Sequence, residues 1–182
     1  MNRDLASQWP YRRDRLVDHE TCATLTKFAD EVLGPATEPI RSVRYRDLWE
    51  HESPAHAQVK RLMYVFRTSA MSIIAGSLDG VGRKYSTGTL ISRWEPGATL
   101  APHNDADMWW RTHTGICYLN EDFSGGQLQF TRSGLTIEPR IGMFVAFPAM
   151  DRSAEHRVLP VIEGRRYTLS VFQTDQLGHA EP

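Results

Sequence analysis

Three residues of metal-binding type stand out in the second half of the chain. His103 and Asp105 are separated by one residue, and His156 follows at the start of a later apolar stretch. Side chains two apart on an extended strand point to the same side, so His103 and Asp105 can both reach one ion. Two histidines and one carboxylate leave coordination positions open on a metal, and these ligands suit Fe(II). The spacing therefore predicts a candidate iron site.

The His-x-Asp motif alone is weak evidence for such a site. A histidine and an aspartate on a solvent-exposed surface would give the same pattern without any ion. The third ligand, His156, also has to come from a segment that is distant in the sequence. The interpretation therefore depends on what the rest of the chain builds.

Composition bounds the class of protein. A chain of 182 residues that is 41% hydrophobic and 24% charged can bury a substantial core. We expect a single domain over residues 1–182, with a helical part over about 1–85 and a strand-rich core over about 86–175. With 21 basic and 22 acidic residues the net charge is −1, which gives no electrostatic case for a nucleic-acid or membrane partner.

The cysteines and the hydropathy of the chain indicate in which compartment we expect the protein. Cys22 and Cys117 are far apart and lack the spacing of a metal-binding or redox motif, so a reducing compartment is the simpler interpretation and one disulfide is the alternative. No apolar run reaches the roughly 18 residues of a membrane span. We therefore expect a soluble, cytoplasmic protein, whose oligomeric state the sequence does not specify.

The first third of the chain has helical patterns. From Asp18 to Leu33 apolar residues recur every three or four positions, with Asp18 as the expected N-cap and Gly34-Pro35 as the stop. A second helix is expected to begin at Ser53-Pro54, a cap followed by a first-turn proline, and to end before Asp79-Gly80.

The remainder of the chain is a series of short β-like runs separated by turn residues. The expected strands are Thr89–Trp94, Thr112–Leu119, Gln127–Phe130, Leu135–Ile137, Met143–Phe147, His156–Val161 and Tyr167–Phe172. Strands that follow one another without intervening helices favour an antiparallel sandwich or barrel, and helices gathered at one end make the class α+β.

From about Thr89 to Phe172 the chain resembles the catalytic core of the 2-oxoglutarate and Fe(II)-dependent dioxygenases, specifically the prolyl 4-hydroxylase-like branch. The segments that carry this resemblance are Arg93-Trp94-Glu95-Pro96-Gly97, Pro102-His103-Asn104-Asp105, Tyr118-Leu119-Asn120, Gly125-Gly126, Pro139-Arg140, Phe147-Pro148, His156-Arg157-Val158 and Gly164-Arg165-Arg166-Tyr167. The resemblance covers roughly the C-terminal half and leaves out residues 1–88.

The resemblance implies a double-stranded β-helix, or jelly-roll, with the N-terminal helices packed on one sheet. It implies that His103, Asp105 and His156 are the iron ligands and catalytic centre. Fe(II) would be the cofactor, and 2-oxoglutarate and O2 would be the cosubstrates. Ascorbate could serve as a supporting reductant.

The distal carboxylate of 2-oxoglutarate needs a cationic partner. Arginine suits this task because its planar fork meets a carboxylate with two charge-assisted bonds. Of the adjacent candidates, the family places its basic residue just before the aromatic Tyr167, which selects Arg166 and leaves Arg165 as a solvated strand residue.

Thr114 and Tyr118 share one face of a strand and resemble residues that line the cosubstrate pocket in this branch. The alternative for Tyr118 is simple core packing with its hydroxyl satisfied locally. Trp94 stands where the family commonly has tyrosine, which puts in doubt a direct hydrogen bond to the cosubstrate at that position.

Trp109, Trp110 and Arg111 follow the ligand pair and are candidate substrate residues. Adjacent tryptophans in a loop cannot both face one core, so one of them is expected at the mouth of the site. The tryptophans would form a wall for the substrate, and Arg111 would meet a substrate carboxylate. Packing of the tryptophans is an equally good explanation.

The expected function is hydroxylation of an unactivated C–H bond in a small molecule or amino-acid-like substrate, with release of succinate and CO2. The short N-terminal region favours a small substrate over the alternative, a peptidyl hydroxylase of the prolyl type. A third hypothesis is a non-catalytic jelly-roll binding module, which the intact ligand set disfavours.

Overall fold

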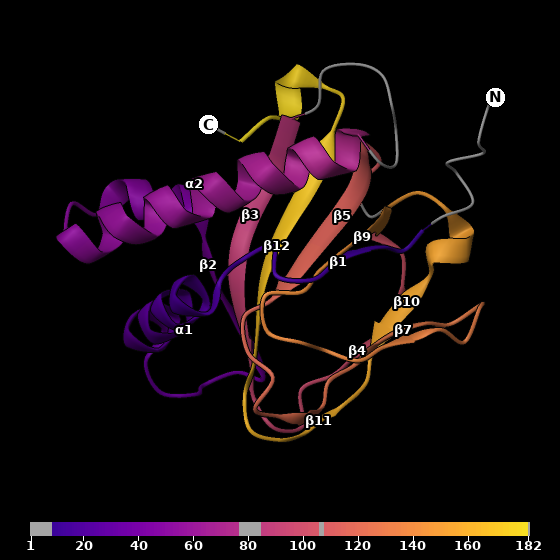
Figure 1. Ribbon diagram of the computed structural model, residues 1–182, viewed down its shortest axis with the longest axis horizontal. Coiled ribbons are helices and arrows are strands. Elements are labelled where there is room, and N and C mark those ends of the chain that lie inside the picture. Colours follow the sequence, from indigo (N-terminus) through magenta and orange to yellow (C-terminus); the bar gives the residue numbers. More distant parts are fainter. Residues whose placement is uncertain (1–8, 77–84, 106–107, 182) are drawn as a thin grey trace.

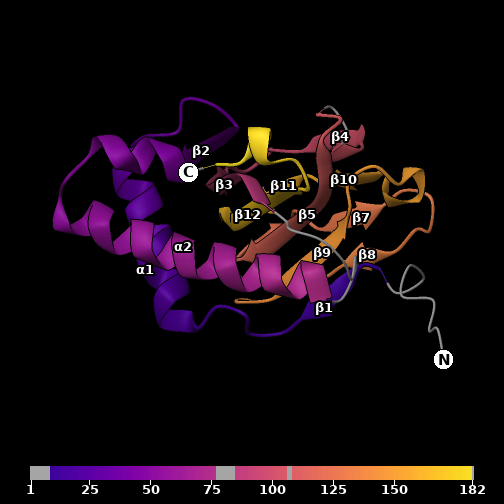
Figure 2. The same ribbon diagram turned by 90° about the horizontal axis from the view of Figure 1, so that it is seen from above.

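The computed structural model describes residues 9–76, 85–105 and 108–181. Within these residues, two α-helices cover the outer face of a large antiparallel sheet, and a smaller sheet faces its inner side (Figure 1). The view from above shows the resulting order of helices, large sheet and small sheet (Figure 2). This mixture of helices and antiparallel sheet agrees with the expected α+β class.

The larger, major sheet has six strands in the order β1-β9-β5-β12-β3-β2. They are β1 (Tyr11–Arg13), β9 (Phe144–Pro148), β5 (Arg111–Tyr118), β12 (Arg166–Thr174), β3 (Tyr85–Trp94) and β2 (Ile40–Arg44). Every neighbouring pair is antiparallel. The long central strands β3, β12 and β5 form the frame on which the other elements pack.

The smaller, minor sheet has the order β4-β10-β7-β8. Its strands are β4 (Leu100–His103), β10 (His156–Val158), β7 (Leu128–Phe130) and β8 (Thr136–Ile137). A separate two-stranded ribbon pairs β6 (Ser124–Gly125) with β11 (Val161–Glu163). Short 3-10 turns are η2 (Tyr45–Glu50), η5 (Arg152–Ala154) and η6 (Leu177–His179).

Both predicted helices are present and begin at the predicted caps. The Asp18 carboxylate accepts the backbone N–H of Thr21 at 2.8 Å ahead of α1 (His19–Leu33), which ends at Gly34 with φ 60°. Ser53 caps α2 (Pro54–Ile74) in the same way. The predicted stop at Asp79-Gly80 lies outside the described residues.

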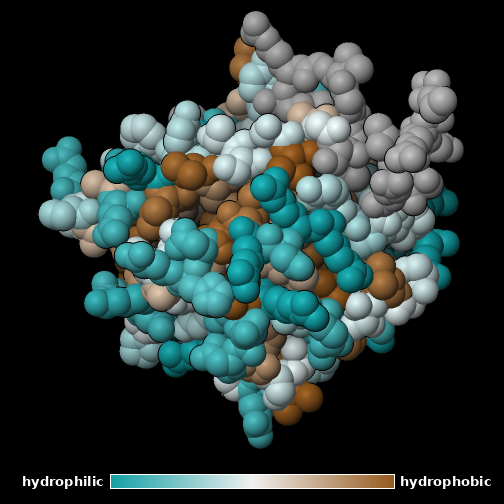
Figure 3. All heavy atoms as spheres, in the orientation of Figure 1, coloured by the Kyte–Doolittle hydropathy of each residue, from teal (hydrophilic) through white to brown (hydrophobic). Residues whose placement is uncertain are grey.

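A purely apolar core joins the helices to the major sheet. Leu25 of α1 and Met63 of α2 are fully buried against Leu169 of β12 and Ile91 of β3. Burying each side chain of this size contributes roughly 1.5–3 kcal/mol. Figure 3 shows that the outer surface on this side is largely hydrophilic, with hydrophobic side chains visible along α2.

A second core fills the space between the two sheets. Phe130 and Val158 of the minor sheet pack there with Phe147, Tyr118 and Trp94 of the major sheet. Alternation along each strand sends one set of side chains to the helices and the other set to this interior. The interior set includes polar groups, and it forms the site described below.

Some expected elements differ from the structure. The first third of the chain is not purely helical, because β1 and β2 add strands to the two edges of the major sheet. The expected strand His156–Val161 is two strands, because Pro160 has no N–H to continue a ladder and the chain passes from β10 to β11.

Two findings concern the expectations on disulfides and membranes. Cys22 and Cys117 are both buried free thiols. Among residues 9–76, 85–105 and 108–181, no helix has the length and apolarity needed to cross a membrane.

Candidate functional site

The predicted ligand residues converge between the two sheets. His103 on β4 pairs directly with His156 on β10, and their ring centroids lie 4.3 Å apart. His103 Nε2 is 3.5 Å from Asp105 Oδ1. One potential ligand atom from each of the three residues lies within 4.8 Å of the others. The arrangement can hold one metal ion and leaves the opposite side of that ion open.

Both histidine rings are held by backbone carbonyl groups. His103 Nδ1 lies 2.9 Å from the oxygen of Ala101, and His156 Nδ1 lies 3.0 Å from the oxygen of Ala154. A proton on each Nδ1 donates to the carbonyl, which leaves Nε2 with a free lone pair. Orientation of ligand histidines through their second nitrogen is typical of metal sites.

Thr114 connects the major sheet to this cluster. Its hydroxyl donates a hydrogen bond of 2.5 Å to Asp105 Oδ2, which leaves Oδ1 on the side of His103. Burial alone would raise the pKa of the Asp105 carboxyl, but its hydrogen bonds and the nearby histidines outweigh burial and lower it. Burial lowers the pKa of His156. Asp105 is therefore anionic and His156 neutral at pH 7, as ligands must be.

Arg166, Tyr118 and Trp94 line a buried pocket farther inside. Arg166 pairs with Trp94 across β12 and β3, and its guanidinium carbon lies 4.7 Å from the Trp94 ring and 5.2 Å from the Tyr118 ring. Arg166 Nε and Nη1, the Tyr118 hydroxyl and Trp94 Nε1 are all buried without a hydrogen-bond partner. Donors from three strands thus lie close together, and none of the ion pairs among the described residues gives Arg166 a carboxylate.

These unpartnered donors fit a carboxylate. A buried polar group without a partner costs roughly 1–3 kcal/mol, and a buried charge costs more. Burial lowers the pKa of the Arg166 guanidinium, partly offset by Tyr118, and raises the pKa of the Tyr118 hydroxyl. A Cβ on Gly126 would lie 2.9 Å from Arg166 Cδ, so glycine leaves the room that the arginine occupies. The pocket suits the distal carboxylate of 2-oxoglutarate, as the sequence resemblance implies.

Residues 89–174 match the family model described as the 2OG-Fe(II) oxygenase superfamily. This segment belongs to the 2OG-Fe(II) oxygenases. The name of the superfamily specifies Fe(II) and 2-oxoglutarate, the cofactor and cosubstrate implied by the resemblance. The ligand cluster and the donor pocket both lie within this segment.

Curated relatives match part of the chain. The chain is 39% identical over 77 residues to proteins named "Prolyl 3-hydroxylase 3" from Mus musculus and from Homo sapiens. The match covers 40% of this chain and 10% of those relatives, so the chain spans about a tenth of their length.

Solved structures share the fold over nearly the whole chain. The viral collagen prolyl hydroxylase of Paramecium Bursaria Chlorella virus-1, in complex with 2OG, has a TM-score of 0.76 at 15% identity and covers 95% of this chain and 99% of that chain. A Pseudomonas putida prolyl-4-hydroxylase has a TM-score of 0.66 at 21% identity, covering 95% and 96%. At these identities the likeness concerns the fold.

The two adjacent arginines of the oxygenase segment lie on opposite sides of β12. Arg166 is 1% exposed inside the pocket. The side chain of Arg165 is 46% exposed and pairs with Glu95 at 3.0 Å on the outside. Strand alternation thus separates the residues as the sequence predicts.

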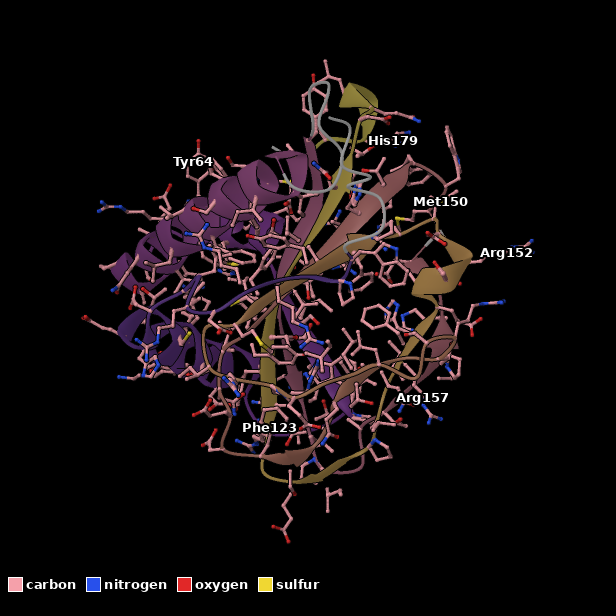
Figure 4. The ribbon with its side chains drawn as sticks, turned by 45° about the vertical axis from the view of Figure 1, so that its right-hand side comes forward. Tyr64, Phe123, Met150, Arg152, Arg157 and His179 are labelled. Carbon is pink, nitrogen blue, oxygen red and sulfur yellow. The ribbon has the colours of Figure 1, made fainter. Side chains whose placement is uncertain are left out.

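The residues that follow the ligand pair in the sequence differ in their surroundings: one is exposed at the surface, and others pack against neighbouring rings. Trp109 is 64% exposed, whereas Trp110 stacks on His179 at 4.1 Å and 6°. The Arg111 guanidinium lies 4.0 Å over the Phe172 ring. His179 and Met150 lie on the same side of the molecule, away from α2 (Figure 4). Trp109 is therefore the exposed tryptophan of the pair, and Trp110 packs on His179.

Sequence reasoning missed one part of this oxygenase site. Trp94 was expected to lose a hydrogen bond relative to tyrosine, but its buried Nε1 is an unpartnered donor beside Arg166. Position 94 pairs with position 166 across β3 and β12, and paired residues share a face. This pairing, which the structure supplies, is what indicates that Trp94 lies on the same side as Arg166.

Proposed function

We propose that this protein is an Fe(II)- and 2-oxoglutarate-dependent hydroxylase that acts on a prolyl residue within a polypeptide. The observation that carries the proposal is the open His103, Asp105 and His156 cluster beside a buried pocket of unpartnered donors. A binding module without catalysis would have no need of this pairing, because the pocket supplies what a 2-oxo acid needs beyond the metal.

Each side chain then has a role. His103, Asp105 and His156 would hold Fe(II), and Thr114 would fix the Asp105 carboxylate by its hydrogen bond. Fe(II) with 2-oxoglutarate and O2 supplies the oxidising power that inserts a hydroxyl group into a C–H bond and releases succinate and CO2.

The inner pocket would orient 2-oxoglutarate. Arg166 and Tyr118 would donate to its distal carboxylate, each charge-assisted bond being worth about 1.5–3 kcal/mol. Trp94 Nε1 would be a further donor, and the Trp94 and Tyr118 rings would exclude water from the ion pair.

The substrate assignment rests on the relatives and on the openness of the site. The curated relatives and the two solved structures described above are named prolyl hydroxylases, which supports the peptidyl alternative better than the small-molecule substrate favoured from the sequence. The side chain of His103 is 30% exposed and Trp109 is 64% exposed, as a site open to a polypeptide requires.

The architecture is part of the proposal. We propose that the two facing sheets are the double-stranded β-helix of the oxygenase fold. Residues 1–182 would act as one unit, because β1 and β2 extend the same major sheet that carries Arg166.

The direct test is a turnover experiment with Fe(II), 2-oxoglutarate, ascorbate and a panel of proline-containing peptides. Succinate is quantified together with the peptide mass, and amino-acid analysis separates 3- from 4-hydroxyproline. The expected result is one added oxygen per succinate on proline. A His103→Ala variant should lose both products.

A matched panel of free amino acids and small acids tests the other substrate class. If these compounds gain oxygen and no peptide does, the small-molecule hypothesis replaces the peptidyl one. If wild type and His103→Ala form equal, background succinate with every substrate and neither binds Fe(II), the enzyme proposal fails.

A further inference from the structure

A groove lined by arginine side chains opens beside the candidate metal site. It has a volume of about 410 Å³ and lies between strands β2, β3 and β12 and residues 178–181. Among its described lining residues, Arg44, Arg46 and Arg111 are basic and only Glu181 is acidic. We call it the arginine groove.

Strand register places this groove next to the metal ligands. Thr114, which donates to Asp105, pairs with Phe172 on β12, and Phe172 pairs with Gly88 on β3. Phe172 and Gly88 line the groove. Gly88 has no side chain, and the Phe172 ring lies over it, since a Cβ at this position would be 3.6 Å from Phe172 Cδ2. The groove therefore begins one strand away from an iron ligand.

The groove carries excess positive charge. Arg44 ends β2 and is exposed, and among the described residues no carboxylate is within ion-pair distance of it. Arg46 is 3.6 Å from Asp47, but both side chains are more than half exposed, and such pairs contribute little.

The acidic residue of the groove is already engaged. The Glu181 carboxylate lies 3.7 Å from Arg67, and its side chain is 4% exposed. Arg111 adds a guanidinium over the Phe172 ring inside the groove. Arginine clusters of this kind recognise acidic motifs in partner chains.

The separation of the charges from the metal selects the kind of anion. Arg44 is three strands from Thr114 in the sheet, or about 14 Å at a spacing of about 4.8 Å. A free amino acid is short, with its carboxylate about 5 Å from its own side-chain carbons, so it would reach Arg111 on β5 more readily than Arg44 on β2. An extended peptide advances about 3.3 Å per residue and spans this gap.

We infer that the arginine groove binds an acidic side chain of the peptide substrate, about two to four positions from the hydroxylated proline. This inference rests on the proposed peptidyl function. Arg44 and Arg46 would supply the charge-assisted bonds, and the peptide backbone would pass over the Phe172 ring. The groove would thus select acidic sequences, whereas the metal and donor pocket perform the reaction.

The test compares peptides that differ only in charge. A proline peptide carries one Glu, Gln or Lys at each position up to four residues on either side of the proline. Hydroxylation gives KM and kcat by mass spectrometry, and fluorescence anisotropy gives Kd on protein loaded with Zn(II) and 2-oxoglutarate. We expect the best Glu peptide to bind about tenfold more tightly than its Gln counterpart, and the Lys peptide more weakly still.

The variants are Arg44→Glu and Arg46→Glu, with Arg61→Glu as the control. Arg61 is exposed on α2 and does not line the groove. The groove variants should lose the preference for Glu and gain one for Lys, with the change in KM rather than kcat. The control should keep the wild-type preference. Circular dichroism and urea unfolding of all three variants check that they fold.

Three outcomes would overturn the inference. Equal Kd values for Glu, Gln and Lys peptides would remove the acidic preference and leave the prolyl hydroxylase proposal intact. A preference that survives in both groove variants would place the selecting charge elsewhere. Absence of binding and hydroxylation for every peptide, with turnover of small acids, would remove the peptide occupant together with the proposed function.

Discussion

Two buried arginines lie on neighbouring strands of the major sheet in opposite surroundings. Arg93 on β3 faces the helices, where its guanidinium lies 3.1 Å from Asp30 and 2.8 Å from Glu95. Arg166 on β12 faces the interior, where it meets aromatic rings and has two nitrogen atoms without a partner. Both residues are 1% exposed.

The contrast separates a structural charge from a functional one. A buried charge is unfavourable unless carboxylates or other acceptors compensate it. The chain supplies this compensation to Arg93 but not to Arg166. An anion from outside the chain is the simplest partner for Arg166, and under the proposed function that anion is 2-oxoglutarate.

Replacement of Arg166 should have the largest effect on ligand binding. Arg166→Met removes two charge-assisted bonds, so Kd for 2-oxoglutarate on Zn(II)-loaded protein should rise about 100- to 1,000-fold. Because the charge has no partner in the free protein, the free energy of unfolding should stay the same or increase. Calorimetric titration and urea unfolding measure the two quantities. A large loss of stability with unchanged Kd would make Arg166 a structural residue.

Replacement of Arg93 should give the opposite pair of results. Arg93→Met leaves Glu95 and Asp30 with only the half-exposed Arg165 guanidinium, and the free energy of unfolding should fall by about 2–3 kcal/mol. Kd for 2-oxoglutarate should change by less than about twofold, because Arg93 points away from the pocket. The same titrations check this. If both variants lost affinity alike, the distinction between the two arginines would collapse.

Trp94→Phe should show a smaller effect on the inner side. The variant keeps an aromatic ring beside Arg166 but removes the Nε1 donor, so Kd for 2-oxoglutarate should rise about tenfold. In NMR spectra of 15N-labelled, Zn(II)-loaded wild-type protein, the Trp94 indole N–H resonance is the one that the spectrum of the variant lacks. This resonance should shift on addition of 2-oxoglutarate. Trp49→Phe, at a 56% exposed position, is the control. If 2-oxoglutarate does not shift the Trp94 indole resonance, Trp94 is excluded as a donor.

The smallest expected effect is on the pH dependence of stability, and it concerns Tyr167 on the helix-facing side of the major sheet. Burial, and then the hydrogen bond to Asp30, raise the pKa of Tyr167 from 10.0 to about 12. The unfolded chain loses this proton first as pH rises, so stability falls between these two values. Two pKa units correspond to at most about 2.7 kcal/mol, and solvent screening reduces the expected loss to about 1 kcal/mol. Tyr167→Phe should flatten that slope in urea unfolding, and Tyr64→Phe, at a 51% exposed position, should not. Equal slopes in all three proteins would contradict the shift.

Local signals explain which elements the sequence predicts. The caps Asp18 and Ser53 act on their own helices, and both helices begin where these residues indicate. The strands β1 and β2 were missed because they are the edges of the major sheet. Edge strands carry charges and bury few residues, as in β2 where only Val43 is buried, so their local pattern is weak.

Some features of the candidate site are likewise predictable from local sequence, and others depend on how distant strands pair. The spacing of His103 and Asp105 predicts a shared direction, but the approach of His156 depends on pairing between β4 and β10, which only the family resemblance supplied. Thr114 was expected in the cosubstrate pocket, and its hydroxyl is bonded to Asp105. Unpartnered atoms such as Trp94 Nε1 exist only in three dimensions, because they depend on what every neighbouring strand fails to provide.

The most direct measurement is a crystal structure of the protein with Mn(II) and 2-oxoglutarate. The predicted result is a metal ion bound by Nε2 of His103, Asp105 and Nε2 of His156, with the distal carboxylate of 2-oxoglutarate between Arg166 and Tyr118. A metal bound without these three ligands, or 2-oxoglutarate lying in the arginine groove with the Arg166 pocket unchanged, would contradict the account.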